Sequence, residues 1–246
     1  MKKAISRICI IMFIVTFSIG GSLNKSSIVM GVTRSEVQEK QIKMDELLVA
    51  KTPDAALELL KAGNERFEKE QLKEVDLSSE KREKLVNGQS PFAVIVACSD
   101  SRVPPELIFN QWLGDLFVVR VAGNVIDKIE LGSVEYAVEH LKTPLIVVMG
   151  HEHCGAVEAA VDANGKKQHG NIGAIINKIE PSVKKMKSKN LQGEKLVEEV
   201  TNENINNSSR EIKESSKAIR EALQKEKIKI VEAKYMLKSG EVQWLN

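Results

Sequence analysis

The stretch from Phe92 to Arg102 constrains the fold of this chain more than any other. It reads Phe-Ala-Val-Ile-Val-Ala-Cys-Ser-Asp-Ser-Arg, so an apolar run leads directly into a polar loop at Cys98. A continuous apolar run bounded by turn residues is typical of a strand buried on both faces, usually in a parallel sheet. Open α/β sheets place their chemistry just beyond the carboxyl ends of such strands. Cys98, Asp100 and Arg102 lie there on alternate residues, which makes this loop a candidate functional site.

A second stretch has the same design. Residues 144–149 (Pro-Leu-Ile-Val-Val-Met) are apolar, and Gly-His-Glu-His-Cys-Gly follows at 150–155. The sequence therefore predicts two buried strands, each of which delivers soft metal ligands at its carboxyl end.

The rest of the chain alternates between helical and strand patterns. Helices are expected over 53–70, 77–85, from 103 onward, over 130–141 and 155–161, and through 171–227 with breaks near 190–193 and 204–209. Further strands are expected over 116–121, 228–237 and 242–245. Strands that alternate with helices indicate a parallel sheet with right-handed crossovers. The predicted fold class is α/β, with a mostly parallel central sheet flanked by helices and an N-terminal helical arm.

The amino terminus predicts export. Lys2, Lys3 and Arg7 supply a positive region, residues 8–19 are almost wholly apolar, and small residues follow at 20–22. This pattern is typical of a secretory signal and is too short for a comfortable membrane span. An uncleaved anchor is the alternative. We expect a signal peptide over 1–22, a linker or arm over 23–52, and a single folded domain over 53–246 that lies in the periplasm, cell envelope or medium without stable membrane insertion.

The composition of the chain indicates how large its core can be and which binding partners it suits. The chain of 246 residues is 42% hydrophobic, enough for one domain with a sizeable core. Its net charge is +2 and only 4% of its residues are aromatic, which gives no basis for a nucleic-acid partner.

Cys98, His151 and Cys154 form a candidate metal site. Two thiolates and one imidazole suit Zn²⁺, which takes four tetrahedral ligands. Three protein ligands leave one position for water, which is the mark of a catalytic zinc site. His153 is the rival imidazole, but it adjoins Cys154, so its side chain is expected to point elsewhere. Cys154 also stands where a helix begins, and the helix dipole favours its thiolate.

Asp100 has three roles open to it. It could be a fourth zinc ligand, a group that orients the zinc-bound water, or a simple turn residue. Arg102 can form a bidentate ion pair with it. A carboxylate held in that way would be drawn from the metal and could accept a hydrogen bond from the water.

These residues resemble the β-class carbonic anhydrases. The likeness rests on Cys-Ser-Asp-Ser-Arg-Val at 98–103 together with Gly-His-x-x-Cys-Gly at 150–155, and it extends over residues 55–245. Supporting segments are Ala-Gly-Asn-Glu-Arg-Phe at 62–67, Gly-Gln-Ser-Pro at 88–91, Gly-Asp-Leu-Phe-Val-Val-Arg at 114–120, Ala-Gly-Asn at 122–124, Tyr235 and Gly-Glu-Val at 240–242. Both metal motifs in the right order, with these flanks between them, are highly specific.

The resemblance implies one zinc per chain, held by Cys98, His151 and Cys154. It also implies reversible hydration of CO₂ to bicarbonate, with zinc hydroxide as the nucleophile and Asp100 with Arg102 as the catalytic dyad. The substrate pocket would lie near four further residues: Gln89, Phe117, Tyr136 and the Gly155 N–H. Members of the family form dimers, so a homodimer or dimer of dimers is expected.

Two departures from the family pattern concern the pocket and its control. Val121 stands where the family often has Asn, so the pocket wall differs. Ile95 stands where members regulated by non-catalytic bicarbonate typically have Trp, which favours an ungated, open site.

Three other functions remain open at this stage. The same scaffold could hydrolyse another heterocumulene such as carbon disulfide. A closed site with Asp100 on the metal would favour a non-catalytic zinc or bicarbonate-binding protein. A disulfide between Cys98 and Cys154 would favour a redox protein, although it leaves His151, Asp100 and Arg102 without a role.

Overall fold

A computed structural model of the protein describes residues 50–245, all of which belong to one compact unit. The predicted signal peptide and most of the predicted linker lie outside the described residues. No helix among the described residues is long and apolar enough to cross a membrane.

The centre of the described region is a 5-stranded sheet with the strand order β2-β1-β3-β4-β5. The strands are β1 (Ala93–Ala97), β2 (Leu116–Arg120), β3 (Leu145–His151), β4 (Lys229–Tyr235) and β5 (Val242–Trp244). All neighbouring pairs are parallel except β4 and β5, which are antiparallel. The predicted α/β class with a mostly parallel sheet is therefore confirmed.

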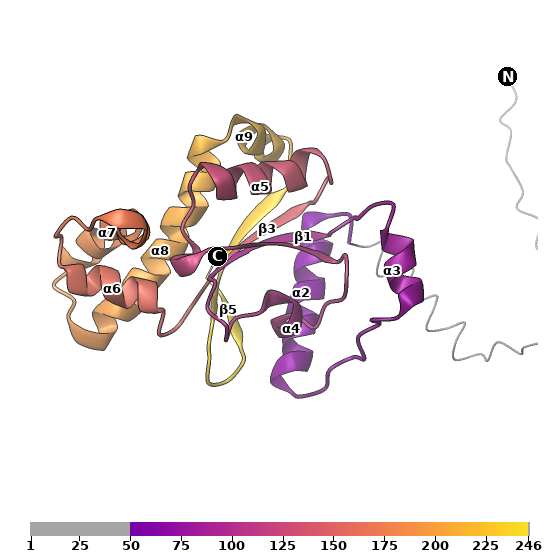
Figure 1. Ribbon diagram of the computed structural model, residues 1–246, viewed down its shortest axis with the longest axis horizontal. Coiled ribbons are helices and arrows are strands. Elements are labelled where there is room, and N and C mark those ends of the chain that lie inside the picture. The colour runs from indigo at the N-terminus through magenta and orange to yellow at the C-terminus, as the bar shows by residue number, and fades with distance from the viewer. Residues whose placement is uncertain (1–49, 246) are drawn as a thin grey trace, which may run out of the picture. The chain divides into compact units, whose positions relative to one another are not determined.

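Helices cover both faces of this sheet, as Figure 1 shows. Their bounds are α2 (Pro53–Glu68), α3 (Ser79–Leu85), α4 (Pro105–Ile108), α5 (Lys128–Glu139), α6 (Gly155–Ala163), α7 (Gly170–Lys187), α8 (Gly193–Ser215) and α9 (Lys217–Gln224), with a 3₁₀ turn, η1, at Ala122–Asn124. Along β1, Ile95 and Ala97 pack with α2 and α4, whereas Val94 and Val96 pack with α5, α8 and α9. Alternate residues of one strand thus enter two cores, which is why the whole strand is apolar.

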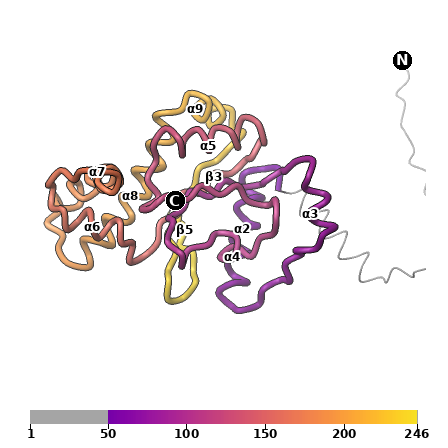
Figure 2. The backbone as a smooth tube through the Cα atoms, viewed as in Figure 1, coloured from indigo at the N-terminus to yellow at the C-terminus, as the bar shows by residue number. Residues whose placement is uncertain are grey.

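A third apolar cluster lies beyond the carboxyl ends of the strands. It joins α6, α7 and the first turns of α8, and it includes Cys98 and Cys154. The tube in Figure 2 shows α6 and α7 together at one side of the sheet, reached by the chain that leaves β3. The predicted metal loops therefore lie against a packed helical layer.

The structure corrects two predicted boundaries. The predicted helix break near 204–209 is wrong, because α8 runs unbroken through this Asn- and Ser-rich segment. The predicted strand over 144–149 also ends too early, because β3 continues to His151, which pairs with Tyr235 of β4. The neighbouring strand, rather than the local sequence, extends β3 by supplying backbone partners.

Candidate metal centre

Three structural elements bring Cys98, His151 and Cys154 together. Cys98 directly follows β1, His151 is the last residue of β3, and Cys154 caps the amino terminus of α6. Because β1 and β3 are parallel neighbours, their carboxyl ends meet at one edge of the sheet. The short connection from β3 to α6 then returns Cys154 to the same point.

The three donor atoms are close enough to share one ion. The Sγ atoms of Cys98 and Cys154 are 4.0 Å apart, and the two sulfurs and an imidazole nitrogen all lie within 4.8 Å of one another. Zn–S bonds of about 2.3 Å in a tetrahedral site would place two sulfurs about 3.8 Å apart. Both cysteines are free, and all three side chains are buried, so a metal held here would be surrounded by protein.

His151 presents one nitrogen to this space. Its Nδ1–H donates to the carbonyl of Glu152 at 2.8 Å, which leaves the lone pair on Nε2. Nε2 is buried and has no hydrogen-bond partner among the described residues. An unpartnered buried nitrogen is costly unless something binds it. The donor set therefore fits a zinc ion, with the backbone of Glu152 fixing the ring orientation.

The surroundings shift the pKa values of the Cys98 and Cys154 thiols in opposite directions. The contact with the Cys154 sulfur, together with His151 and the backbone N–H groups of Asp100 and Gly123, lowers the pKa of Cys98 to about 4, against the opposing effect of burial. The contact with Cys98 and burial raise the pKa of Cys154. The site thus favours a thiolate at Cys98 over one at Cys154.

Asp100 and Arg102 form a bidentate pair beside the donors. The Arg102 side chain donates from Nε to Oδ1 at 2.9 Å and from Nη2 to Oδ2 at 2.7 Å, and its backbone N–H also donates to Oδ1 at 2.9 Å. These bonds, the side-chain ones first, hold the pKa of Asp100 well below its usual range. Oδ2 remains 3.9 Å from His151 Nε2, so the carboxylate faces the donor space while Arg102 restrains it.

Arg120 is a site residue that the sequence analysis did not single out. It ends β2, next to Ala97 of β1, and its guanidinium donates to the carbonyls of Cys98 and Asp100. It therefore fixes the backbone of the loop that carries both a metal donor and the dyad carboxylate. The sequence offered one signal for this role, which is that Arg120 is a charged residue at the carboxyl end of a predicted strand.

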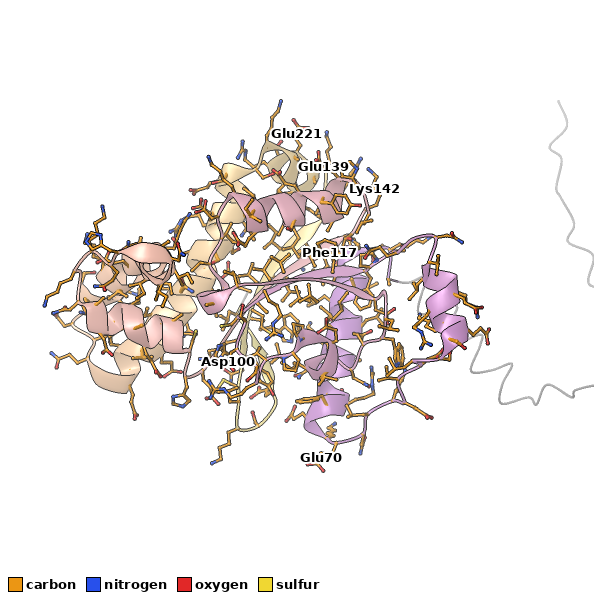
Figure 3. All side chains as sticks on the ribbon, viewed as in Figure 1. Glu70, Asp100, Phe117, Glu139, Lys142 and Glu221 are labelled. Atoms are coloured by element: carbon orange, nitrogen blue, oxygen red, sulfur yellow. The ribbon has the colours of Figure 1, made fainter. Side chains whose placement is uncertain are left out.

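The residues predicted for the substrate pocket lie in several places. Gly155 begins α6, directly after Cys154, and Gln89 is exposed in the segment before β1. Phe117 of β2 and Tyr136 of α5 have ring centroids 6.2 Å apart. Figure 3 labels Phe117 on the sheet beneath α5 and Asp100 beyond the strand ends.

A cavity of about 530 Å³ is lined in part by Glu152 and His153, which lie between β3 and α6. His153 lines it with Glu158 of α6 and Lys234 of β4, and it does not belong to the group of three residues whose donor atoms lie together. None of Gln89, Phe117 and Tyr136 lines this cavity.

Fold and site define the class of protein. A parallel α/β sheet that brings two thiols and one imidazole together beside a braced Asp–Arg pair is an architecture for a catalytic metal. The family model "Carbonic anhydrase" matches residues 93–242. The chain belongs to this family, in its β class.

Individual proteins that the chain resembles support this family assignment. The chain is 41% identical over 197 residues to a carbonic anhydrase of Mycolicibacterium smegmatis, covering 78% of this chain and 92% of that one. It is 50% identical over 133 residues to carbonic anhydrase 2 of Mycobacterium tuberculosis, covering 53% and 64%. Among solved structures, the β-carbonic anhydrase CcaA matches with a TM-score of 0.63 and 30% identity over 68% of this chain and 78% of that one. A tetrameric β-carbonic anhydrase of Sordaria macrospora matches with a TM-score of 0.61 and 26% identity over 67% and 85%.

Proposed function

We propose that this protein catalyses the reversible hydration of CO₂ to bicarbonate and a proton, at a zinc ion held by Cys98, His151 and Cys154. The observation that carries the proposal is the buried, unpartnered Nε2 of His151, on a ring that has one nitrogen within 4.8 Å of two cysteine sulfurs. When bound there, zinc supplies a Lewis acid that lowers the pKa of water from 15.7 to about 7 in a favourable site. The three protein donors leave one of its four positions for that water.

Asp100 and Arg102 supply the orienting part of the mechanism. The Asp100 carboxylate is ionised and faces the donor space, so Oδ2 can accept a hydrogen bond from a water molecule there. This bond would direct an oxygen lone pair towards the carbon of CO₂. Arg102 restrains the carboxylate through two side-chain bonds, and its Nη2 also donates to the carbonyl of His153 at 3.2 Å. The dyad is thus tied to both metal loops.

The test is a comparison of metal content with CO₂ hydration. Zinc-replete protein should contain one zinc per chain and accelerate CO₂ hydration in a stopped-flow assay with a pH indicator. Protein stripped by a chelator should lose this activity, and zinc should restore it. Zinc-replete protein without CO₂ hydration would reject the proposal, and parallel assays with carbon disulfide would then examine the rival heterocumulene reaction.

We also propose that the enzyme is a homodimer or a dimer of dimers. Support comes from the tetrameric β-carbonic anhydrase of Sordaria macrospora and from β2, which is an edge strand of the sheet. Near this edge Tyr136 is 48% exposed, and its ring centroid lies 6.2 Å from that of Phe117 on β2. Sedimentation equilibrium should give a mass of two or four chains, and a fully active monomer would reject the assembly.

Export is the third part of the proposal. The positive, then apolar, then small-residue pattern of residues 1–22 supports cleavage near Ser22 and a location outside the cytoplasmic membrane. Amino-terminal sequencing of protein recovered from cell fractions tests it. Full-length protein with Met1 intact in the cytosol would contradict it.

A further inference from the structure

The segment at 204–209 of α8 has a composition that helices usually avoid. It reads Asn-Ile-Asn-Asn-Ser-Ser, and these polar residues favour turns and caps over helix interiors. The helix nevertheless continues through it, and Asn204 and Ser208 are only 1% and 2% exposed. Buried polar side chains at such positions need partners, and the partners show what the segment does.

Both side chains bind the 3₁₀ turn η1. Asn204 Nδ2 donates to the carbonyl of Gly123 at 2.8 Å, and Ser208 Oγ donates to the carbonyl of Asn124 at 2.8 Å. Residues four apart lie on one helix face, so a single face of α8 holds two consecutive carbonyls of η1. In Figure 1, α8 runs from its end near α9 towards α6 and α7.

The other side of η1 holds the metal donor Cys98. The backbone N–H of Gly123 donates to Cys98 Sγ at 3.3 Å. Gly123 has a φ of 69°, and a Cβ there would lie 2.8 Å from Ile179 Cδ1. The turn is therefore placed by packing on one side and by hydrogen bonds from α8 on the other.

We propose that Asn204 and Ser208 are positioning residues, which act through η1 to hold the Gly123 N–H on the Cys98 sulfur. An N–H donor to a thiolate stabilises its charge and fixes the direction of its remaining lone pairs. The two side chains thereby set how tightly Cys98 binds zinc and how strongly it donates. This inference rests on the proposed function, since it takes zinc as the ion at this centre.

The chain offers a matched control next to Ser208. Ser209 lies on the same helix and is 0% exposed, yet its Oγ has no hydrogen-bond partner within residues 50–245. Ser208→Ala and Ser209→Ala remove the same atom from adjacent buried positions, but only Ser208→Ala removes a bond to η1. Asn204→Leu removes the donor to Gly123 with little change in side-chain volume.

The experiment measures zinc affinity by competition with a chromophoric chelator, and the sulfur-to-metal charge-transfer absorption after substitution with Co²⁺. Asn204→Leu should bind zinc about tenfold more weakly than wild type, in the range seen when groups behind metal ligands are removed. Ser208→Ala should show a smaller weakening in the same direction. Both should shift the charge-transfer band, whereas Ser209→Ala should match wild type in both measurements.

The possible outcomes separate the positioning role of Asn204 and Ser208 from the proposed zinc-dependent function. Equal zinc affinity and identical Co²⁺ spectra in Ser208→Ala and Ser209→Ala would overturn the positioning role while leaving the proposed function intact. If Asn204→Leu does not fold, this serine pair still decides the question. Wild-type protein that fails to bind zinc stoichiometrically would instead overturn the proposed function, and this inference with it.

Discussion

Arg102 holds Asp100 in a fixed orientation through parallel side-chain bonds of 2.9 Å and 2.7 Å. Two parallel bonds from a planar guanidinium restrain a carboxylate far better than one ammonium contact does. Asp100 Oδ2 is consequently held 3.9 Å from the nitrogen that His151 presents to the metal.

Arg102→Ala should release Asp100 and abolish most of the activity without removing zinc. The freed carboxylate can reach the open metal position and exclude water, so the rate of CO₂ hydration should fall about 100-fold or more. Stopped-flow rates and zinc content measured on the same sample check this. Arg210→Ala is the control, because the Arg210 side chain is 44% exposed and its partner Glu203 keeps a second ion pair with Lys185. Near wild-type turnover in Arg102→Ala would show that the Asp100–Arg102 pair only stabilises the loop and does not take part in catalysis.

The three donors should be individually indispensable for zinc. Cys98→Ser, His151→Ala and Cys154→Ser should each lose stoichiometric metal, because a three-ligand site has no spare donor. His153→Ala should retain it, since that side chain lines the neighbouring cavity. Elemental analysis after dialysis provides the measurement. Loss of zinc from His153→Ala together with its retention in His151→Ala would reverse the assignment.

Zinc uptake should release about one proton per ion at pH 7. The pKa of Cys98 is lowered to about 4, so this sulfur is already a thiolate, whereas the raised pKa of Cys154 keeps it protonated until the metal displaces its proton. Apparent affinity should therefore rise about tenfold for each unit of pH between roughly 7 and 8. Calorimetry in buffers with different ionisation enthalpies counts the protons. Release of two protons would show that both thiols are neutral without metal.

Gly123→Ala should destabilise the protein because of its backbone conformation and its surroundings. The residue has a φ of 69°, and an added Cβ would approach Ala156 Cβ to 3.1 Å as well as Ile179. The strained conformation alone costs about 1–3 kcal/mol in the free energy of unfolding. Gly132→Ala, in an open position within α5, should instead raise that free energy by about 0.5–1 kcal/mol. Denaturant unfolding measures the free energy of unfolding of both variants. Equal changes in Gly123→Ala and Gly132→Ala would contradict the prediction.

The parts of the fold that local patterns determine could be predicted from the sequence. The apolar runs before Cys98 and before Gly150 form β1 and β3, and their parallel pairing explains why donors 53 residues or more apart meet. The polar segment at 204–209 misled the analysis, because its helical state depends on the carbonyls of η1, which are distant in sequence. Arg120 was missed for the same reason, since its role depends on register with β1.

The position of His151 within β3 has a consequence for how the protein acquires its metal. Its backbone is paired with β4 through Tyr235, and its ring is locked by the carbonyl of Glu152, so neither depends on an ion for its place. We therefore expect folding and metal loading to be separable events. A chain that has lost its zinc should keep the position of His151, so one divalent ion should exchange for another without passage through an unfolded state.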